Sequence, residues 1–259
     1  SQNLKNLIIF LFMERCRILA FNVYNVLPSD ARFNQILEMF ETVDPDIIVL
    51  TECGPEAFDR FHALFEANSG VYAPADYWGN GIIVRHHDVL DGGAVDLTVI
   101  DEHRSAAVAE LALSDSTTIK LVATHLEIGG EHHRLRQIEI LDEDVGISDA
   151  VLVGDLNALN RRDYLQEQNL LRLETRRKQG GRPPARWGVM DRLLDEFTCL
   201  DAAEGYSFQA TTPYHSRVDY ILVGPESGVI PVADTYRVIE GILSGMSDHN
   251  AVVCDIQAD

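Results

Sequence analysis

The segment Val151–Asn157 (VLVGDLN) ends a short apolar run with a carboxylate and a carboxamide two positions apart. The apolar run is typical of a buried β-strand, and residues two apart in a strand project from the same side. Asp155 is therefore placed to take a proton from water, while Asn157 holds a phosphoryl oxygen or a metal-bound water. An ordinary turn favours the same residue types, so this segment alone does not distinguish a catalytic site from a loop.

Other expected strands are also bounded by polar residues that can bind a metal or transfer a proton. Such residues lie at or near the ends of the segments 17–23, 47–52 and 119–125, and near the starts of the segments 217–223 and 251–254. The residues are Asn22, Glu52, His125, Asp219, Asp248 and His249. Each has a simpler interpretation alone, because a carboxylate at a strand exit is often a surface charge and a lone histidine is often structural. Their repeated position at strand boundaries predicts that they converge on one site.

The elements that position these residues alternate between strands and helices. Apolar residues at helical spacing predict helices over 33–40, 58–65, 131–141 and 190–197, with Arg134 on an outer face of the third. Strands that alternate with helices are typical of an α/β domain.

Length and composition predict one globular domain. The chain has 259 residues, 46% hydrophobic and 24% charged, and no Gly-, Ser- or Pro-rich stretch long enough for a linker. We therefore expect a single domain over 14–259. The four cysteines are widely spaced and form no C-x-x-C pair, which argues against a disulfide framework and a zinc site. We expect reduced thiols in a cytoplasmic, monomeric protein.

Residues 1–13 are expected to form a leader or an N-terminal extension. The apolar run 7–13 is too short to cross a bilayer, and no small-residue cleavage site follows it as in a signal peptide. A docking strand, peripheral contact with a membrane and a secreted nuclease are the alternatives that this run leaves open.

Charge is distributed unevenly along the chain. A formal net charge of −20 would repel a nucleic-acid backbone if it were spread evenly. The segment 161–186 instead holds eight basic residues against three acidic ones, a local charge of +5 that leaves −25 elsewhere. This segment is either a solvated, mobile loop or a surface that faces the substrate. The segment begins just after Asn157 and therefore beside the expected site, so we take Arg161, Arg162 and Arg186 as candidate substrate contacts.

The ordered set of motifs resembles the endonuclease/exonuclease/phosphatase superfamily, which includes pancreatic DNase I and the abasic-site endonucleases. The motifs are Gly-Asp-x-Asn at 154–157, Arg-Val-Asp-Tyr-Ile at 217–221, Ser-Asp-His at 247–249 and Thr-His-Leu at 124–126, together with Asn22 and Glu52. The resemblance spans roughly residues 15 to 257. It implies a four-layer α-β-β-α sandwich of two facing mixed β-sheets flanked by helices.

The resemblance also implies roles for the polar residues. Glu52 would bind Mg²⁺ or Mn²⁺, with Asp248 and Asn22 completing or hydrogen-bonding the metal shell. Asp155 would activate the attacking water, and Asn157 would hold that water and a phosphoryl oxygen. His249, oriented by Asp219, would stabilise the developing charge or transfer a proton, and His125 would contact the phosphate from the opposite side.

The sequence departs from the family pattern at one metal-shell position. Many members carry an acidic residue two positions after the first-strand Asn, where this chain has Tyr24. The metal shell then depends on Glu52, and a second metal is less expected. Gly54 stands where some abasic-site nucleases have Lys, while Thr-His-Leu-Glu at 124–127 looks more like the tyrosyl-DNA phosphodiesterase branch.

We therefore expect a metal-dependent phosphodiesterase acting on nucleic acid or a nucleotide. A phospholipid or an inositol phosphate is the alternative substrate, since the same constellation serves all of these within the family. A non-catalytic scaffold that retains the fold and binds a partner through its basic segment is the alternative of another class.

Overall fold

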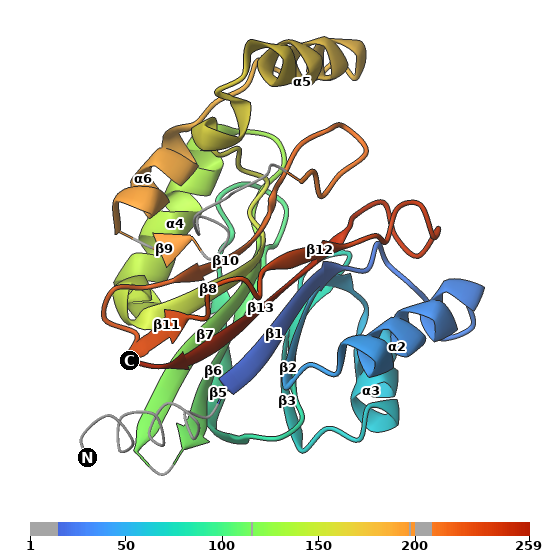
Figure 1. The fold of residues 1–259 in the computed structure, drawn as a ribbon, viewed down its shortest axis with the longest axis vertical. Coiled ribbons are helices and arrows are strands. Elements are labelled where there is room, and N and C mark those ends of the chain that lie inside the picture. The colour runs from blue at the N-terminus through green and yellow to red at the C-terminus, as the bar shows by residue number, and fades with distance from the viewer. Residues whose placement is uncertain (1–14, 115, 197, 200–208) are drawn as a thin grey trace, which may run out of the picture.

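The computed structural model describes residues 15–114, 116–196, 198–199 and 209–259. The expectation for residues 1–13 lies outside this part of the chain. Within it, two mixed β-sheets face each other and helices cover the outer face of each, so the predicted four-layer sandwich is confirmed (Figure 1).

The first sheet has seven strands in the order β11-β13-β1-β2-β4-β3, with β12 also paired to β13. Only the β1–β2 pair is parallel among the described pairs of this sheet. Its strands are β1 (Arg15–Asn22), β2 (Ile47–Cys53), β3 (Ser69–Ala73), β4 (Gly79–Val84), β11 (Val229–Pro231), β12 (Arg237–Ile239) and β13 (Ala251–Ala258).

The second sheet has six strands in the order β5-β6-β7-β8-β10-β9, in which β7 and β8 are parallel. Its strands are β5 (Asp88–Asp96), β6 (Ser105–Ser114), β7 (Thr117–His125), β8 (Ala150–Asp155), β9 (Thr198–Cys199) and β10 (Asp219–Val223).

In the described part of the chain, four helices form the outer layers, and two short 3-10 helices and a further helix lie in the connections. Helices α2 and α3 pack on the first sheet, and α4 and α6 pack on the second. The bounds are α2 (Ala31–Val43), α3 (Pro55–Leu64), α4 (Glu131–Val145), η1 (Ile147–Asp149), η2 (Arg161–Tyr164), α5 (Glu167–Gln179) and α6 (Gly188–Glu196). Phe197, at the end of the predicted helix 190–197, lies outside the described residues.

Alternation along the strands creates three apolar layers. In β1, Ile18 and Ala20 pack between the two sheets, while Leu19 packs against α2 and α3. In β8, Val153 packs between the sheets and Leu152 packs against α4 and α6. Both faces of these strands are buried, as expected for central strands covered by helices on one side and by another sheet on the other.

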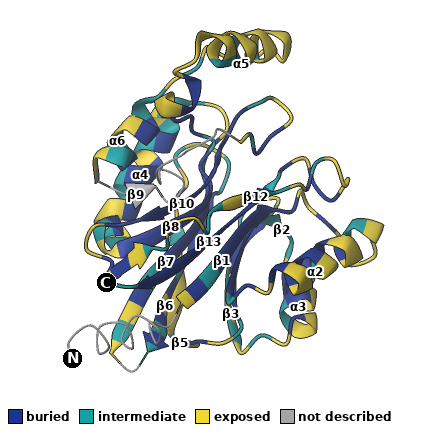
Figure 2. Ribbon diagram, viewed as in Figure 1, coloured by how far each residue is buried: buried dark blue, intermediate teal, exposed yellow. Residues whose placement is uncertain are grey.

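The structure differs from one of the two interpretations of the basic segment and from the predicted position of Arg134. The basic segment is not a loop throughout, because it contains η2 and the helix α5, which projects from the body and buries only Leu173 of its own residues (Figure 2). Arg134 is not on an outer face of α4 but is 8% exposed. The helical period explains this, since Arg134, Ile138 and Leu141 are spaced i, i+4, i+7 and therefore share one face.

No helix in the described part of the chain combines the length and apolar character that a membrane crossing requires. Cys16, Cys53 and Cys254 are buried and free of disulfide bonds.

Candidate active site

The inner faces of two strands bring Asn22 and Asp155 together. Asn22 continues the inward-facing row of Ala20 in β1, and Asp155 continues that of Val153 in β8. Both side chains are buried, and Asn22 Nδ2 donates to Asp155 Oδ2 at 3.2 Å. Because β1 and β8 belong to different sheets, this hydrogen bond spans the gap between the two sheets at their edge.

Three polar residues form one row across the second sheet. In the strand register, Asp155 lies opposite His125 on one side and opposite Asp219 on the other. All three are buried. The His125 Nε2–Asp155 Oδ2 distance is 3.5 Å. The predicted strand-end residues therefore meet because neighbouring strands of this sheet end in register.

Glu52 reaches the same row through an irregularity in β2. Regular alternation would turn Glu52 towards the helices, because Leu50 packs there. The pairing of β2 with β4 instead shifts between Leu50 and Cys53, and Glu52 adopts a φ of 50°. Its Oε1 accepts a hydrogen bond from Asn22 Nδ2 at 3.1 Å and lies 3.9 Å from His125 Nδ1. A bulge of this kind re-aims a side chain towards a site.

The turn after β8 is also conformationally unusual. Asn157 has a φ of 47°, and its backbone N–H donates to Asp155 Oδ1 at 2.9 Å. Asn157 Nδ2 donates to Leu126 O at 3.0 Å and lies 3.0 Å from His125 Nε2. Left-handed backbone at non-glycine residues costs energy and is concentrated at functional sites. The turn therefore holds Asn157 between Asp155 and His125.

Residues 247–249, in the turn that leads into β13 of the first sheet, supply the remaining groups. Ser247 Oγ donates to Asn22 O at 2.6 Å and accepts from His249 N at 3.1 Å, which fixes the approach to β13. His249 Nδ1 lies 2.8 Å from Asp219 Oδ2, and its Nε2 lies 3.7 Å from Asp155 Oδ2. Asp248 lines the same pocket and is exposed.

The two histidines differ in charge at neutral pH, since one is neutral and the other is positively charged. Burial lowers the pKa of His125 to about 4, and the positive charge of Arg104 acts in the same direction. Burial also disfavours the charged form of His249, but the charge and hydrogen bond of Asp219 outweigh it and raise the pKa of His249 to about 10. A neutral imidazole and an imidazolium therefore flank Asp155.

The carboxylates at this end of the pocket fit a hard divalent cation. Burial raises the pKa of Glu52 to about 7, and the nearby charges of Asp155 and Asp248 add to this effect. Oxygen donors with excess negative charge are what Mg²⁺ or Mn²⁺ requires. The residues that would hold such an ion are Glu52 and Asp248, with Asn22 hydrogen-bonded to Glu52.

A second arrangement of possible ligands overlaps with this one. Donor atoms of Asp155, Asp219 and His249 lie within 4.8 Å of one another. A protonated imidazole has no lone pair to offer, and His249 is held in that form by Asp219. We therefore favour the Glu52 end as the cation site and treat His249–Asp219 as a charged pair.

Another cluster of possible ligands, Cys16, Asp46 and His87, lies at the opposite end of β1 from Asn22. The thiol makes it a softer donor set than the oxygen groups beside Asp155.

The candidate substrate arginines are only partly at the site. Arg186 lines the pocket, whereas Arg161 and Arg162 do not. Arg161 instead pairs with Asp191 at 3.0 Å, over the ring of Trp187.

Sequence reasoning missed four other arginines that line this pocket, namely Arg104, Arg134, Arg177 and Arg182. Arg177 and Arg182 belong to the basic segment, whose charge already indicated contact with an anion. The helical period places Arg134 on the buried face of its helix, so the sequence contained an indication for three of the four arginines.

The fold and the site together define a class of protein. Two facing sheets that carry an acidic and histidine-rich pocket at one edge are the arrangement of the metal-dependent phosphoesterases. The sequence profile of the Endonuclease/Exonuclease/phosphatase family matches residues 19–249, and the chain belongs to that family.

Solved structures of low sequence identity share the fold. An endonuclease/exonuclease/phosphatase from Bacteroides vulgatus has a TM-score of 0.71 and 18% identity, covering 95% of this chain and 99% of that one. One from Beutenbergia cavernae DSM 12333 has a TM-score of 0.66 and 18% identity, covering 95% and 72%. D. rerio TDP2 in complex with a single-strand DNA product has a TM-score of 0.63 and 18% identity, covering 94% and 99%. No curated protein matches the sequence.

Proposed function

We propose that this chain is a divalent-metal-dependent phosphoesterase that hydrolyses a phosphodiester by attack of a water that Asp155 activates. The observation that carries the proposal is the convergence of Glu52, His125, Asp155 and His249, contributed by both sheets, on one pocket of about 980 Å³. Such a pocket with clustered ionisable groups of shifted pKa is typical of an active site.

Each residue has a task that its surroundings support. A bound Mg²⁺ or Mn²⁺ would neutralise the negative charge of the phosphate, and Glu52 and Asp248, supported by Asn22, would hold it. Asp155 orients the attacking water and accepts its proton. Asn157 is placed to hold that water and a phosphoryl oxygen. His249, positively charged and oriented by Asp219, stabilises charge that develops on the phosphoryl oxygens. His125 contacts the phosphate as a neutral imidazole.

Nucleic acid or a nucleotide is our first choice of substrate, and a phospholipid or an inositol phosphate is the second. The single-strand DNA product bound to D. rerio TDP2 supports the first choice. The arginines that line the pocket support an anionic substrate of either kind.

Hydrolysis of bis-(p-nitrophenyl) phosphate with Mg²⁺ or Mn²⁺ tests the proposal. Asp155→Ala should lower kcat by about 10²–10⁴ because it removes the group that accepts the proton of the water. Asp144→Ala removes an exposed carboxylate of α4 outside the pocket and is the matched control, with the wild-type rate expected. Equal rates for wild type and Asp155→Ala would refute the assignment.

Metal binding separates the enzyme from a non-catalytic scaffold. Calorimetry should show that the wild type binds Mn²⁺ and that Glu52→Gln, which removes the buried charge, binds it at least tenfold more weakly, about 1.4 kcal/mol. A wild type that neither binds the metal nor hydrolyses the substrate would favour the scaffold.

A further inference from the structure

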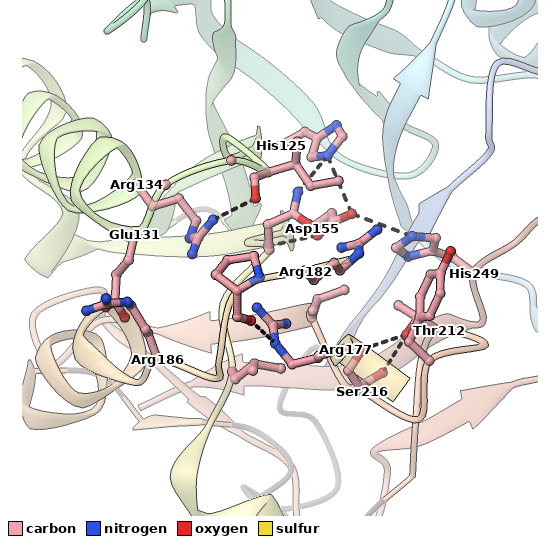
Figure 3. A pocket seen from close by; sticks show the side chains of 18 of the residues that line it. His125, Glu131, Arg134, Asp155, Arg177, Arg182, Arg186, Thr212, Ser216 and His249 are labelled. Atoms are coloured by element: carbon pink, nitrogen blue, oxygen red, sulfur yellow. Dashed lines mark hydrogen bonds and ion pairs between the residues drawn. The ribbon is translucent and has the colours of Figure 1, made fainter. Parts of the chain in front are cut away.

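The pocket continues from the carboxylates into a basic region that the proposed chemistry does not use. Figure 3 shows Arg134, Arg177 and Arg182 around the cavity that His125, Asp155 and His249 also face. We call Arg134, Arg177 and Arg182 the arginine wall. It is built by α4, by the end of α5 and by the loop that follows α5.

In the described part of the chain no carboxylate lies within ion-pair distance of the arginine wall, although the charges of Glu127, Glu131 and Glu174 act on it from farther away. Among the described residues, none forms an ion pair with Arg134, Arg177 or Arg182. Arg134 is 8% exposed, its Nη1 donates to the carbonyl oxygens of Glu127 and Ile128, and its Nε has no hydrogen-bond partner.

Among the described residues, the other two members of the wall hydrogen-bond to or stack on neutral groups. Arg177 Nε donates to Pro183 O at 2.8 Å, and the guanidinium of Arg182 lies 4.8 Å from the ring centroid of Tyr214. Burial lowers the pKa of Arg177, and the charge of Arg182 lowers it further. The charge of Glu174 acts in the opposite direction, but no described carboxylate forms an ion pair with Arg177.

Elsewhere the fold pairs the arginines that it buries. Arg217, which is 1% exposed, donates from Nε and Nη2 to both carboxylate oxygens of Asp163, and Arg104 pairs with Glu102 at 2.8 Å. Burying a guanidinium without an anion is costly, and removing its partner is strongly destabilising. The contrast indicates that the wall receives its anion from outside the chain.

Two further charged residues line this side of the pocket. Glu131 is the acidic one, but its Oε1 accepts a hydrogen bond from Gly188 N at the start of α6 at 2.7 Å. Arg186 adds another positive charge and is exposed. Four arginines against one engaged carboxylate leave the region basic in a chain whose formal net charge is −20.

We propose that the arginine wall is a subsite for a second phosphate group of the substrate, so that phosphoesters with an additional phosphate are preferred over those charged only at the scissile group. This inference rests on the proposed function and adds the substrate class to it. Guanidinium groups bind phosphate oxygens bidentately, which suits a tetrahedral anion held beside the reacting one.

Phosphate binding without turnover is the first test. In EDTA, calorimetry with inorganic pyrophosphate should give affinities at least tenfold weaker for Arg177→Gln/Arg182→Gln than for the wild type. Arg136→Gln removes one arginine charge, as Arg182→Gln alone does, from an exposed position of α4 outside the pocket and should bind like the wild type. Arg182→Gln alone, which breaks no side-chain hydrogen bond among the described residues, replaces the double variant if that variant unfolds. Equal affinity in all proteins, or none in the wild type, would overturn the subsite.

Paired substrates then identify the source of the second phosphate. The kcat/KM of thymidylyl-thymidine is compared with and without a 5′-phosphate, and that of glycerophosphoinositol with that of glycerophosphoinositol 4-phosphate, all of which contain a phosphodiester. A preference of at least tenfold for the substrate with the additional phosphate, reduced in the arginine variant, supports the subsite. The pair that shows the preference identifies the substrate class, either the 5′-phosphorylated end of a nucleic acid or a phosphorylated inositol. No preference in either pair overturns it. A chain that binds pyrophosphate through the wall but hydrolyses nothing would refute the proposed function and keep the subsite.

Discussion

The carboxylate of Asp155 is the point on which the polar groups of the pocket converge. Its Oδ2 lies 3.2 Å from Asn22 Nδ2, 3.5 Å from His125 Nε2 and 3.7 Å from His249 Nε2. One imidazole beside it is neutral and the other is charged, because Asp219 supports only the second. Two histidines with the same neighbour are therefore given different states by their other contacts.

The charged state of His249 makes a prediction about stability and pH. The pKa of His249 is about 10 in the folded protein against an ordinary value of 6.5, so folding takes up a proton between these values. The stabilisation is fully present below about pH 6.5 and is lost as the pH rises through about 10. Asp219→Asn removes the charge that holds this proton.

Urea unfolding measures the effect of Asp219→Asn. The wild type should be more stable than this variant near pH 6.5 by a few kcal/mol, since one pKa unit corresponds to about 1.4 kcal/mol. The difference should shrink steadily as the pH approaches about 10, where the wild type also loses the proton. A difference that stays constant with pH would show that the pair acts only through its packing.

At the scale of secondary-structure elements, the ends of β2 and β8 adopt backbone conformations that break the regular alternation of side chains along a strand. Glu52 turns towards the site through a bulge with a φ of 50°. Gly154, one residue before Asp155, has a φ of 134°, and a Cβ there would lie 2.1 Å from Thr124 O in the neighbouring strand β7. Only glycine permits β7 and β8 to approach so closely at this point.

Gly154→Ala should therefore damage both the fold and the activity. We expect a loss of at least about 4 kcal/mol of unfolding free energy, because neither strand backbone can move without breaking the sheet. Gly228→Ala is the control, since Gly228 has a φ of 70° but nothing within 4 Å of the added Cβ. It should cost only about 1–2 kcal/mol from backbone strain. Chemical denaturation of both variants provides the comparison, and equal losses would contradict the steric argument.

The same two elements show what sequence reasoning could achieve. Apolar runs with polar ends located β1, β2, β7, β8 and β10, and the family resemblance supplied the sandwich that brings their ends together. The direction of Glu52 was not predictable from alternation, because the bulge that reverses it leaves no signature in the local sequence. The burial of Arg134 was predictable from its spacing with Ile138, but its charge argued for the outside.

For the basic segment, composition indicated contact with an anion but did not indicate which arginines would make it. Its charge predicted contact with an anion, yet Arg161 and Arg162 lie away from the pocket that Arg177 and Arg182 line. Which arginines face inward is decided by the packing of Tyr164 and Leu173 against Leu159 and related residues, a small cluster that holds α5. Such long-range packing is not visible in local sequence patterns.

At the scale of the whole molecule, the acidic surface and the arginine wall respond oppositely to salt. The formal net charge of −20 produces self-repulsion that opposes the compact state. Raising NaCl from about 50 to 500 mM screens this repulsion, so thermal unfolding should shift upward by a few degrees. The same salt should weaken pyrophosphate binding at the arginine wall by about tenfold or more.

A matched variant separates the two salt effects. Arg177→Gln/Arg182→Gln keeps the acidic surface and should retain the rise in Tm, while the salt dependence of its residual pyrophosphate affinity should be flatter than that of the wild type. Calorimetry and differential scanning fluorimetry at both salt concentrations give the two readouts. A wild-type affinity that does not change with salt would show that the wall does not contact the anion.

The contribution of both sheets to one pocket has a consequence for how the protein is made. Asn22 and His249 lie more than two hundred residues apart in the sequence, and the hydrogen bond between Ser247 and the carbonyl of Asn22 joins these distant parts. A growing polypeptide that lacks the second part has the first carboxylates but no imidazolium beside them. With the proposed function, hydrolytic competence would then appear only after His249 has been synthesised, so a chain interrupted between the two parts would be inactive.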